Sequence, residues 1–291
     1  MLHPEEILLR KCGLGILISM LLAWPAVAAE SLDGPSRGPF PGRAETGKPA
    51  TKLLLIGGPF DGHPPGSHEY MQGTRIMETI LQRMGDSLSI RVTNSEGEWL
   101  EGPNLVDSAD GVVLFRDQGA RWLQQDTSGQ RLAAFQRLQA RGGGLVALHM
   151  GMATVPAEPI DAFLPLYGAC FGGPDRKRTE PDHLAQIRVP NPCHPISAGI
   201  QPFAARDEFY FDLKFAPSAC WTPILESDFA GGAHAIAWAW ERPDDGRSFG
   251  FTGLHMHDNW QLPEYRRLVV QAILWTLHSP VPADFDFSLP Q

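Results

Sequence analysis

Four short stretches of this sequence place histidine or carboxylate side chains at or near the ends of predicted strands. They are His68-Glu69, His149, segment 206–210 and segment 255–258. The carboxyl ends of parallel strands meet at one edge of a sheet, where open α/β proteins bind their ligands. Neighbouring strands lie about 4.8 Å apart, so side chains that are distant in sequence can meet there. The pattern predicts a shared site at one edge of one sheet.

Imidazole and carboxylate groups gathered in this way suit metal binding or proton transfer. We predict that His68, His149 and His255 bind a divalent metal such as zinc, which accepts neutral imidazoles and can keep one position open for water or substrate. Glu69, Glu208 and His149 are the predicted catalytic residues, for ligation or acid/base work. A metal-free site could use the same groups as general acid and base.

Each of these residues also has a structural alternative. Glu69 could be a first-turn carboxylate that the helix dipole favours. His149 could be a buried histidine bonded to backbone, and Glu208 could form an ion pair with a neighbouring arginine. Their common location at strand ends is what favours the functional interpretation.

The elements that must position these residues alternate between strands and helices. Apolar runs at 53–58, 109–115 and 145–148 predict strands that are buried on both faces, as in a parallel sheet. Apolar residues at helical spacing predict helices at 69–84 and 130–140. This alternation indicates βαβ units and an α/β fold.

The second half of the chain has a different pattern. It predicts strands at 182–189 and 207–215 and a hairpin whose strands are 233–241 and 247–254. A helix over 264–278 closes the fold. A further strand is predicted at 87–93.

Composition and missing motifs exclude several function classes. The 291-residue chain has a formal net charge of -9 and no run rich in Lys or Arg, so binding to nucleic acid phosphates is not expected. No G-x-S-x-G elbow of a serine hydrolase follows a predicted strand, and the sequence contains no H-E-x-x-H zinc motif. It also lacks the glycine-rich loops that bind nucleotide phosphates, so no nucleotide cofactor is predicted.

The N-terminus has the pattern of a secretory signal peptide. Arg10 and Lys11 precede an apolar stretch at 13–24, and small residues follow at 26–29. The apolar stretch is shorter than the roughly 20 residues of a membrane span, so no stable span is expected after cleavage. We therefore predict a signal peptide over 1–29 and a periplasmic or secreted protein.

Three further parts follow the signal peptide. Residues 30–50 are rich in Gly, Pro, Ser and charge and read as a linker or surface arm, 51–280 form the folded domain, and 281–291 form a C-terminal tail. The mature chain keeps Cys170, Cys193 and Cys220, so at most one disulfide can form within it, and the spacing leaves the pairing open.

Seven blocks in order along 52–277 resemble the trehalose-utilisation (ThuA-like) family. The blocks are Leu54-Leu55-Ile56-Gly57-Gly58, His63-Pro64-Pro65-Gly66-Ser67-His68-Glu69-Tyr70, Asp110-Gly111-Val112-Val113-Leu114, Gly142-Gly143-Gly144-Leu145-Val146-Ala147-Leu148-His149, His194-Pro195-Ile196-Ser197-Ala198-Gly199-Ile200, Arg206-Asp207-Glu208-Phe209-Tyr210 and Gly250-Phe251-Thr252-Gly253-Leu254-His255. The domain over 51–280 is therefore similar to a ThuA-like domain.

The resemblance implies a flavodoxin-like sheet with helices on both faces, as in class I glutamine amidotransferases. Those enzymes carry a cysteine nucleophile on the sharp turn after a central strand. The similar turn in this chain is Leu148-His149-Met150-Gly151, so glutamine amidotransferase activity is not expected.

The family is associated with sugar metabolism, including keto-sugar derivatives of disaccharides. The resemblance therefore implies a small carbohydrate or keto-sugar as the partner. We interpret the chain as an exported enzyme that acts on such a compound through a His/Glu site with a possible metal. The alternative is a non-catalytic carbohydrate-binding or accessory protein on the same scaffold.

The export hypothesis predicts a mature N-terminus near Glu30, because Ala26-Val27-Ala28 supplies the small residues that signal peptidase accepts. N-terminal sequencing of the exported protein checks this. Recovery of Met1 from that material would contradict it.

Overall fold

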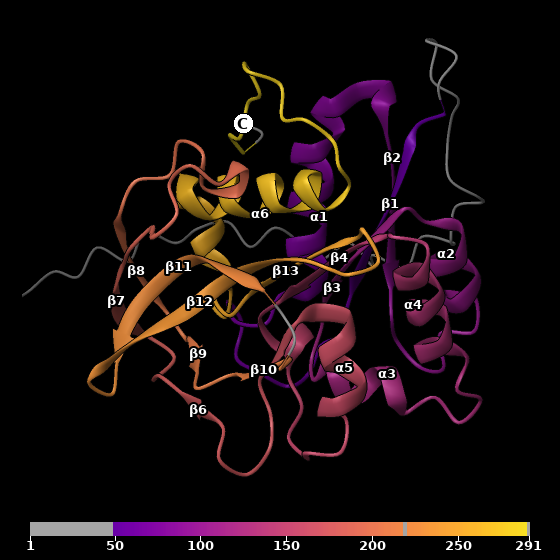
Figure 1. The fold of residues 1–291 in the computed structure, drawn as a ribbon, viewed down its shortest axis with the longest axis horizontal. Helices are drawn as coiled ribbons and strands as arrows, with labels where there is room; N and C mark the ends of the chain where they lie inside the picture. The colour runs from indigo at the N-terminus through magenta and orange to yellow at the C-terminus, as the bar shows by residue number, and fades with distance from the viewer. Residues whose placement is uncertain (1–48, 218–219, 290–291) are drawn as a thin grey trace, which may run out of the picture. The chain divides into compact units, whose positions relative to one another are not determined.

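A seven-stranded sheet organises the part of the chain that the computed structural model describes, residues 49–217 and 220–289 (Figure 1). The predicted signal peptide and nearly all of the predicted arm lie outside these residues. In spatial order the strands are β11 (Trp221–Phe229), β12 (Gly232–Glu241), β13 (Arg247–Phe251), β4 (Gly144–Leu148), β3 (Gly111–Phe115), β1 (Thr51–Gly57) and β2 (Leu88–Asn94).

The five strands from β13 to β2 are parallel, and β12 and β11 extend the sheet in antiparallel fashion. The carboxyl ends of β13, β4, β3 and β1 therefore lie next to one another at one edge. The sheet is mostly parallel, which confirms the predicted α/β class.

Helices cover both faces of the sheet (Figure 1). One face is covered by α1 (Tyr70–Leu81) and α6 (Pro263–Thr276), and the other by α2 (Gly102–Ser108), α3 (Gly119–Gln124), α4 (Gln130–Ala140) and α5 (Ile160–Tyr167). A hydrophobic core lies on each face of the sheet, and successive residues of β1 alternate between them. Leu53 and Leu55 pack in one core, and Leu54 and Ile56 pack in the other. Burial on both faces explains the unbroken apolar runs in the sequence.

None of the helices in the described ranges combines the length and the apolar character that a bilayer crossing requires. Within residues 49–217 and 220–289, four short 3₁₀ segments complete the helical structure: η1 (Gln82–Ser87), η2 (His149–Met152), η3 (Pro195–Ser197) and η4 (His257–Gln261).

The single strand predicted over 207–215 is wrong. The chain there forms three short pieces, each paired with a different partner. The pairs are β8 (Phe203–Asp207) with β7 (His183–Ile187), β9 (Tyr210–Phe211) with β6 (Lys177–Arg178), and β10 (Lys214–Phe215) with β5 (Ala169–Cys170).

The first break follows Asp207, whose carboxylate is bonded to backbone outside β8, and the second contains Asp212 at a φ of 53°. The aromatic run at 209–211 has high β-propensity, but tertiary contacts decide where the strand ends. Strand β11 has no counterpart among the predicted strands.

Close backbone packing fixes the turn that follows β4. A Cβ on Gly151 would lie 2.2 Å from the carbonyl oxygen of Leu114, and a Cβ on Gly119 would lie 2.1 Å from the carbonyl oxygen of Gly151. No side chain fits at either contact, so the turn is pressed against β3 and α3.

We predict that Gly151→Ala lowers the free energy of unfolding by about 1–3 kcal/mol, because the added methyl group forces the turn away from β3. Chemical denaturation measures the change. Gly232→Ala is the matched control, since the nearest atom to its added Cβ is 3.7 Å away. Equal effects of the two substitutions would contradict the packing argument.

Candidate metal centre

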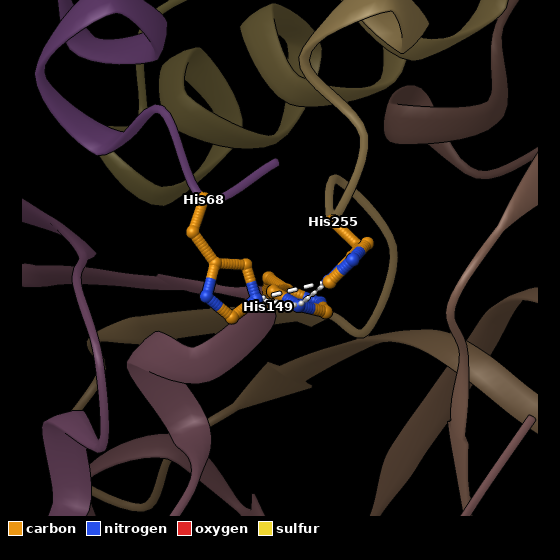
Figure 2. Close-up of side chains that lie close together, drawn as sticks. All are labelled: His68, His149 and His255. Atoms are coloured by element: carbon orange, nitrogen blue, oxygen red, sulfur yellow. Dashed lines mark hydrogen bonds between the residues drawn. The ribbon is translucent and has the colours of Figure 1, made fainter. Parts of the chain in front are cut away.

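Three histidine rings from three strand ends meet at the carboxyl edge of the sheet (Figure 2). His68 lies in the loop after β1, His149 directly follows β4, and His255 lies in the loop after β13. The Nε2 atom of His68 is 3.0 Å from Nε2 of His149 and 2.9 Å from Nδ1 of His255, and the last two atoms are 3.3 Å apart. The structure thus brings together all three predicted metal ligands.

The backbone is left-handed at each of the three turns. His68 has a φ of 55°, His149 a φ of 48°, and Leu254, just before His255, a φ of 77°. Non-glycine residues in this region cost conformational energy and need support from their surroundings. The turns that carry the rings are therefore held in place by other contacts.

Backbone hydrogen bonds join the loops that carry His68 and His255. The His68 N–H donates to the His255 carbonyl oxygen at 3.0 Å, and the His257 N–H donates to the Gly66 carbonyl oxygen at 2.7 Å. Ser67 and Met256 form an antiparallel β-bridge between the two loops. These contacts set the spacing of two of the rings before any side chain is considered.

The buried carboxylate of Asp207 anchors the turn before His255. It accepts hydrogen bonds from four backbone N–H groups and one hydroxyl group. The donors are Leu254 N (2.6 Å), His255 N (3.0 Å), Met256 N (3.1 Å), Glu208 N (3.0 Å) and the Tyr265 hydroxyl (3.1 Å). Burial raises the pKa of Asp207 to about 7, and the backbone and Tyr265 donors oppose this rise.

Hydrogen bonds on the outer side of two rings determine their tautomers. Nδ1 of His149 lies 2.8 Å from the carbonyl oxygen of Thr252, and Nδ1 of His68 lies 2.6 Å from a carboxylate oxygen of Asp61. A carbonyl oxygen and an ionised carboxylate only accept, so both Nδ1 atoms carry the proton. In the neutral form of both rings, the lone pairs are on the two Nε2 atoms, which face each other.

Asp61 supports the rings from outside. One of its oxygens binds His68 Nδ1 and accepts from the Tyr70 hydroxyl at 2.9 Å, and the other lies 2.8 Å from Nδ1 of His63. Although burial opposes ionisation, the bonds from His68 and His63 lower the pKa of Asp61 well below its usual range. A carboxylate behind a ligating histidine is the usual outer partner in metal sites.

Burial also keeps the other two rings neutral. It lowers the pKa of His149 well below its usual value, and the nearby rings of His68 and His255 add to this effect. It lowers the pKa of His255 to about 4, again with a contribution from His68. Neutral imidazole is the form that ligates a metal.

The spacing of the three nitrogens suits a tetrahedral ion. Zinc binds histidine nitrogen at about 2.0–2.1 Å, which places neighbouring ligands about 3.3 Å apart. The observed separations run from 2.9 to 3.3 Å. The group of His68, His149 and His255 could hold a metal ion.

Glu208 and Tyr210 complete the centre. The Tyr210 hydroxyl is 2.9 Å from Nε2 of His149, and Oε2 of Glu208 is 3.9 Å from that atom and 3.8 Å from Nδ1 of His255. Oε1 of Glu208 pairs with Arg178. Burial raises the pKa of Glu208, and the charge of Arg178 opposes the rise. One carboxylate oxygen is thus fixed by Arg178 and the other faces the ring nitrogens.

Glu69 lies apart from this cluster. Its Oε1 accepts from the Gly66 N–H at 3.1 Å, within the loop that carries His68. No hydrogen bond or ion pair in the described ranges joins Glu69 to the three rings. The structure therefore brings Glu208 to the centre and gives Glu69 a contact that shapes the loop.

A cleft of about 590 Å³ opens above the centre. His68, His255, Glu208 and Tyr210 line it, whereas the ring of His149 is fully buried behind them. A ligand in the cleft reaches two of the three rings and the Glu208 carboxylate directly.

Several supporting residues are absent from the predicted site. They are Asp61, Tyr70, Asp207, Tyr210 and Thr252. Tyr210 and Asp207 stand beside Glu208 in the sequence, and Asp61 stands close to His68, so proximity to a predicted ligand is the signal that could have found them.

Comparison with known proteins shows where related sequences and folds occur. The sequence model of the family described as trehalose utilisation, ThuA, matches residues 60–276. A search of curated proteins finds no match. A ThuA-like protein from Bacteroides uniformis ATCC 8492 superposes with a TM-score of 0.58 at 16% identity, covering 82% of this chain and 95% of its own.

Two further structures are similar. A cytoplasmic protein from Salmonella typhimurium has a TM-score of 0.53 at 13% identity, with 77% of this chain and 98% of its own covered. The glutaminase domain of Trypanosoma brucei CTPS, with bound acivicin, has a TM-score of 0.43 at 10% identity, with 83% and 98% covered. The similarities to the Bacteroides uniformis and Salmonella typhimurium proteins show the fold alone.

We predict that Asp207→Asn destabilises the protein by about 1–3 kcal/mol, because the amide nitrogen would face N–H and O–H donors that now bond to oxygen. Thermal and chemical denaturation measure the loss. Asp86→Asn removes the same charge at an exposed position and should have little effect. If both substitutions leave stability unchanged, Asp207 does not anchor the His255 turn.

Proposed function

Because the chain belongs to the trehalose-utilisation (ThuA) family, we propose that it is an exported, metal-dependent enzyme that acts on a carbohydrate or keto-sugar. The family supports the class of substrate, the geometry of the centre supports the chemistry, and the N-terminal sequence pattern supports the export.

One observation carries the metal in this proposal. Nε2 of His68 and Nε2 of His149 lie 3.0 Å apart, and the acceptors at both Nδ1 atoms favour the neutral tautomer whose lone pair is on Nε2. Two lone pairs cannot form a hydrogen bond with each other. A cation between them removes the repulsion, and the third nitrogen, from His255, completes a zinc-like ligand set.

A metal bound there would polarise a carbonyl or hydroxyl oxygen of the substrate. Glu208 would move the proton, since its Oε2 faces the centre while Arg178 holds Oε1. The Tyr210 hydroxyl would donate to a substrate oxygen beside His149. These groups match the general acid/base work that sugar hydroxyls and carbonyls require.

Amidotransferase chemistry has no support in the described residues. The turn after β4 carries His149, and Cys170 is buried with its thiol directed to the carbonyl oxygen of Met152. Burial raises the pKa of the Cys170 thiol, which disfavours the thiolate that a nucleophile needs. Cys193 and Cys220 are exposed, and neither lines the cleft.

We expect His149→Ala to lower zinc affinity by more than 100-fold, because even the loss of an outer partner of a ligand costs about 10–100-fold. Metal analysis after dialysis against zinc measures the bound fraction. His183→Ala is the control, since His183 lies in β7 outside the centre. Full zinc occupancy in His149→Ala would contradict the metal centre.

Metal analysis and a turnover assay are also applied to Glu208→Gln, which keeps the shape of the side chain. It should retain the metal and lose about 10²–10⁴-fold in turnover of keto-sugars, because it removes the proton-transfer group. A wild-type protein that binds carbohydrates with metal present but turns none of them over would favour the non-catalytic alternative.

A further inference from the structure

Two arginines line the wall of the cleft at β6. Arg176 directly precedes β6, and Arg178 is the second residue of that strand. Both arginines line the cleft, whereas Lys177 points away from it and pairs with Asp212 at 2.6 Å. The register with β9, in which Arg178 lies opposite Tyr210, fixes this wall next to the metal centre.

The two arginines differ in their partners. Arg178 is neutralised by Glu208. Arg176 donates from Nη1 to the carbonyl oxygen of Gly173 at 2.9 Å, and it forms no ion pair with any residue that the structure describes. The acidic residue next to it in sequence, Asp175, pairs with Lys214 on the other side. Arg176 is thus a solvent-exposed cation at the wall of the cleft, without a carboxylate partner among the described residues.

The rest of the lining is consistent with a small ligand that has both apolar and charged parts. Met150, Phe171 and Met256 supply apolar surface in the same cleft. Asp258 also lines the cleft, but it comes from η4 and forms no ion pair with Arg176. The protein carries a formal net charge of -9, so an unpaired cation at this position is not part of a generally basic surface.

We propose that Arg176 forms an anion subsite, so that the preferred substrate is a carbohydrate bearing a carboxylate or phosphate group. This inference rests on the proposed function for the class of substrate. The planar guanidinium presents paired N–H donors that match the oxygens of a carboxylate or phosphate group. The anionic group binds Arg176 while the hydroxyl or carbonyl oxygens of the same molecule reach the centre.

The test is a binding comparison on the mature, zinc-loaded protein at fixed ionic strength. Calorimetry measures the affinity for D-glucose, D-gluconate and D-glucose 6-phosphate. At least one of the two anions should bind about tenfold more tightly than glucose, the size expected for a charge-assisted contact that is partly exposed to solvent. Which of the two binds more tightly distinguishes a carboxylate ligand from a phosphate ligand.

Two variants localise the effect. Arg176→Gln should remove the preference for the anion and leave glucose binding unchanged. Lys177→Gln removes the same charge at the next residue, which does not line the cleft, and should keep the preference. Equal binding of neutral and anionic sugars, an equal loss in both variants, or no binding of either anion at millimolar concentration would overturn the subsite.

Metal analysis of each sample separates this inference from the proposed function. A protein without metal contradicts the metal-dependent enzyme, yet the ratio of anion to glucose binding still tests Arg176, which belongs to the chain itself. A protein with metal and no preference for anions leaves the proposed function standing and overturns the subsite.

Discussion

The structure depends on three imidazole nitrogens that are forced within 3.3 Å of one another in a buried position. Neutral His68 and His149 rings that carry their proton on Nδ1 present the Nε2 lone pairs to each other at 3.0 Å, which is unfavourable without a cation between them. Burial disfavours relief by protonation of His149. A metal ion held there would relieve the repulsion without placing a proton on the ring, and the rest of the centre positions the three rings.

Two carboxylates hold the arrangement from opposite sides. Asp61 orients His68 from the β1 loop, and Asp207 gathers the backbone of the His255 turn. Neither lines the cleft, and both act on the rings only by positioning them. The left-handed turns at His68, His149 and Leu254 store conformational energy that these contacts offset. Loss of either carboxylate should therefore loosen the centre before it affects the sheet.

The sheet and the three ligands could be predicted from the sequence for the same reason. Apolar runs identify strands that are buried on both faces, and parallel strands bring the residues after them to one edge. The other parts of the site and of the fold depend on tertiary contacts, which the spacing of apolar residues in the sequence does not reveal. Glu69 and Glu208 both stand next to predicted strand ends, and only the path of the loops decides that Glu208 reaches the rings. The run at 207–215 has the composition of one strand, but Asp207 bonds to the β13 loop and the strand ends there.

The turn after β4 shows how one fold can support different chemistry. A cysteine at such a turn must be accessible, because it attacks the substrate itself. His149 is fully buried, stacks on Tyr210 with ring centroids 4.8 Å apart, and presents only Nε2 to the other rings. It cannot contact a ligand in the cleft except through what lies between them. A metal ion held by the three rings would connect His149 to such a ligand, and the left-handed turn after β4 directs the buried ring toward the other two.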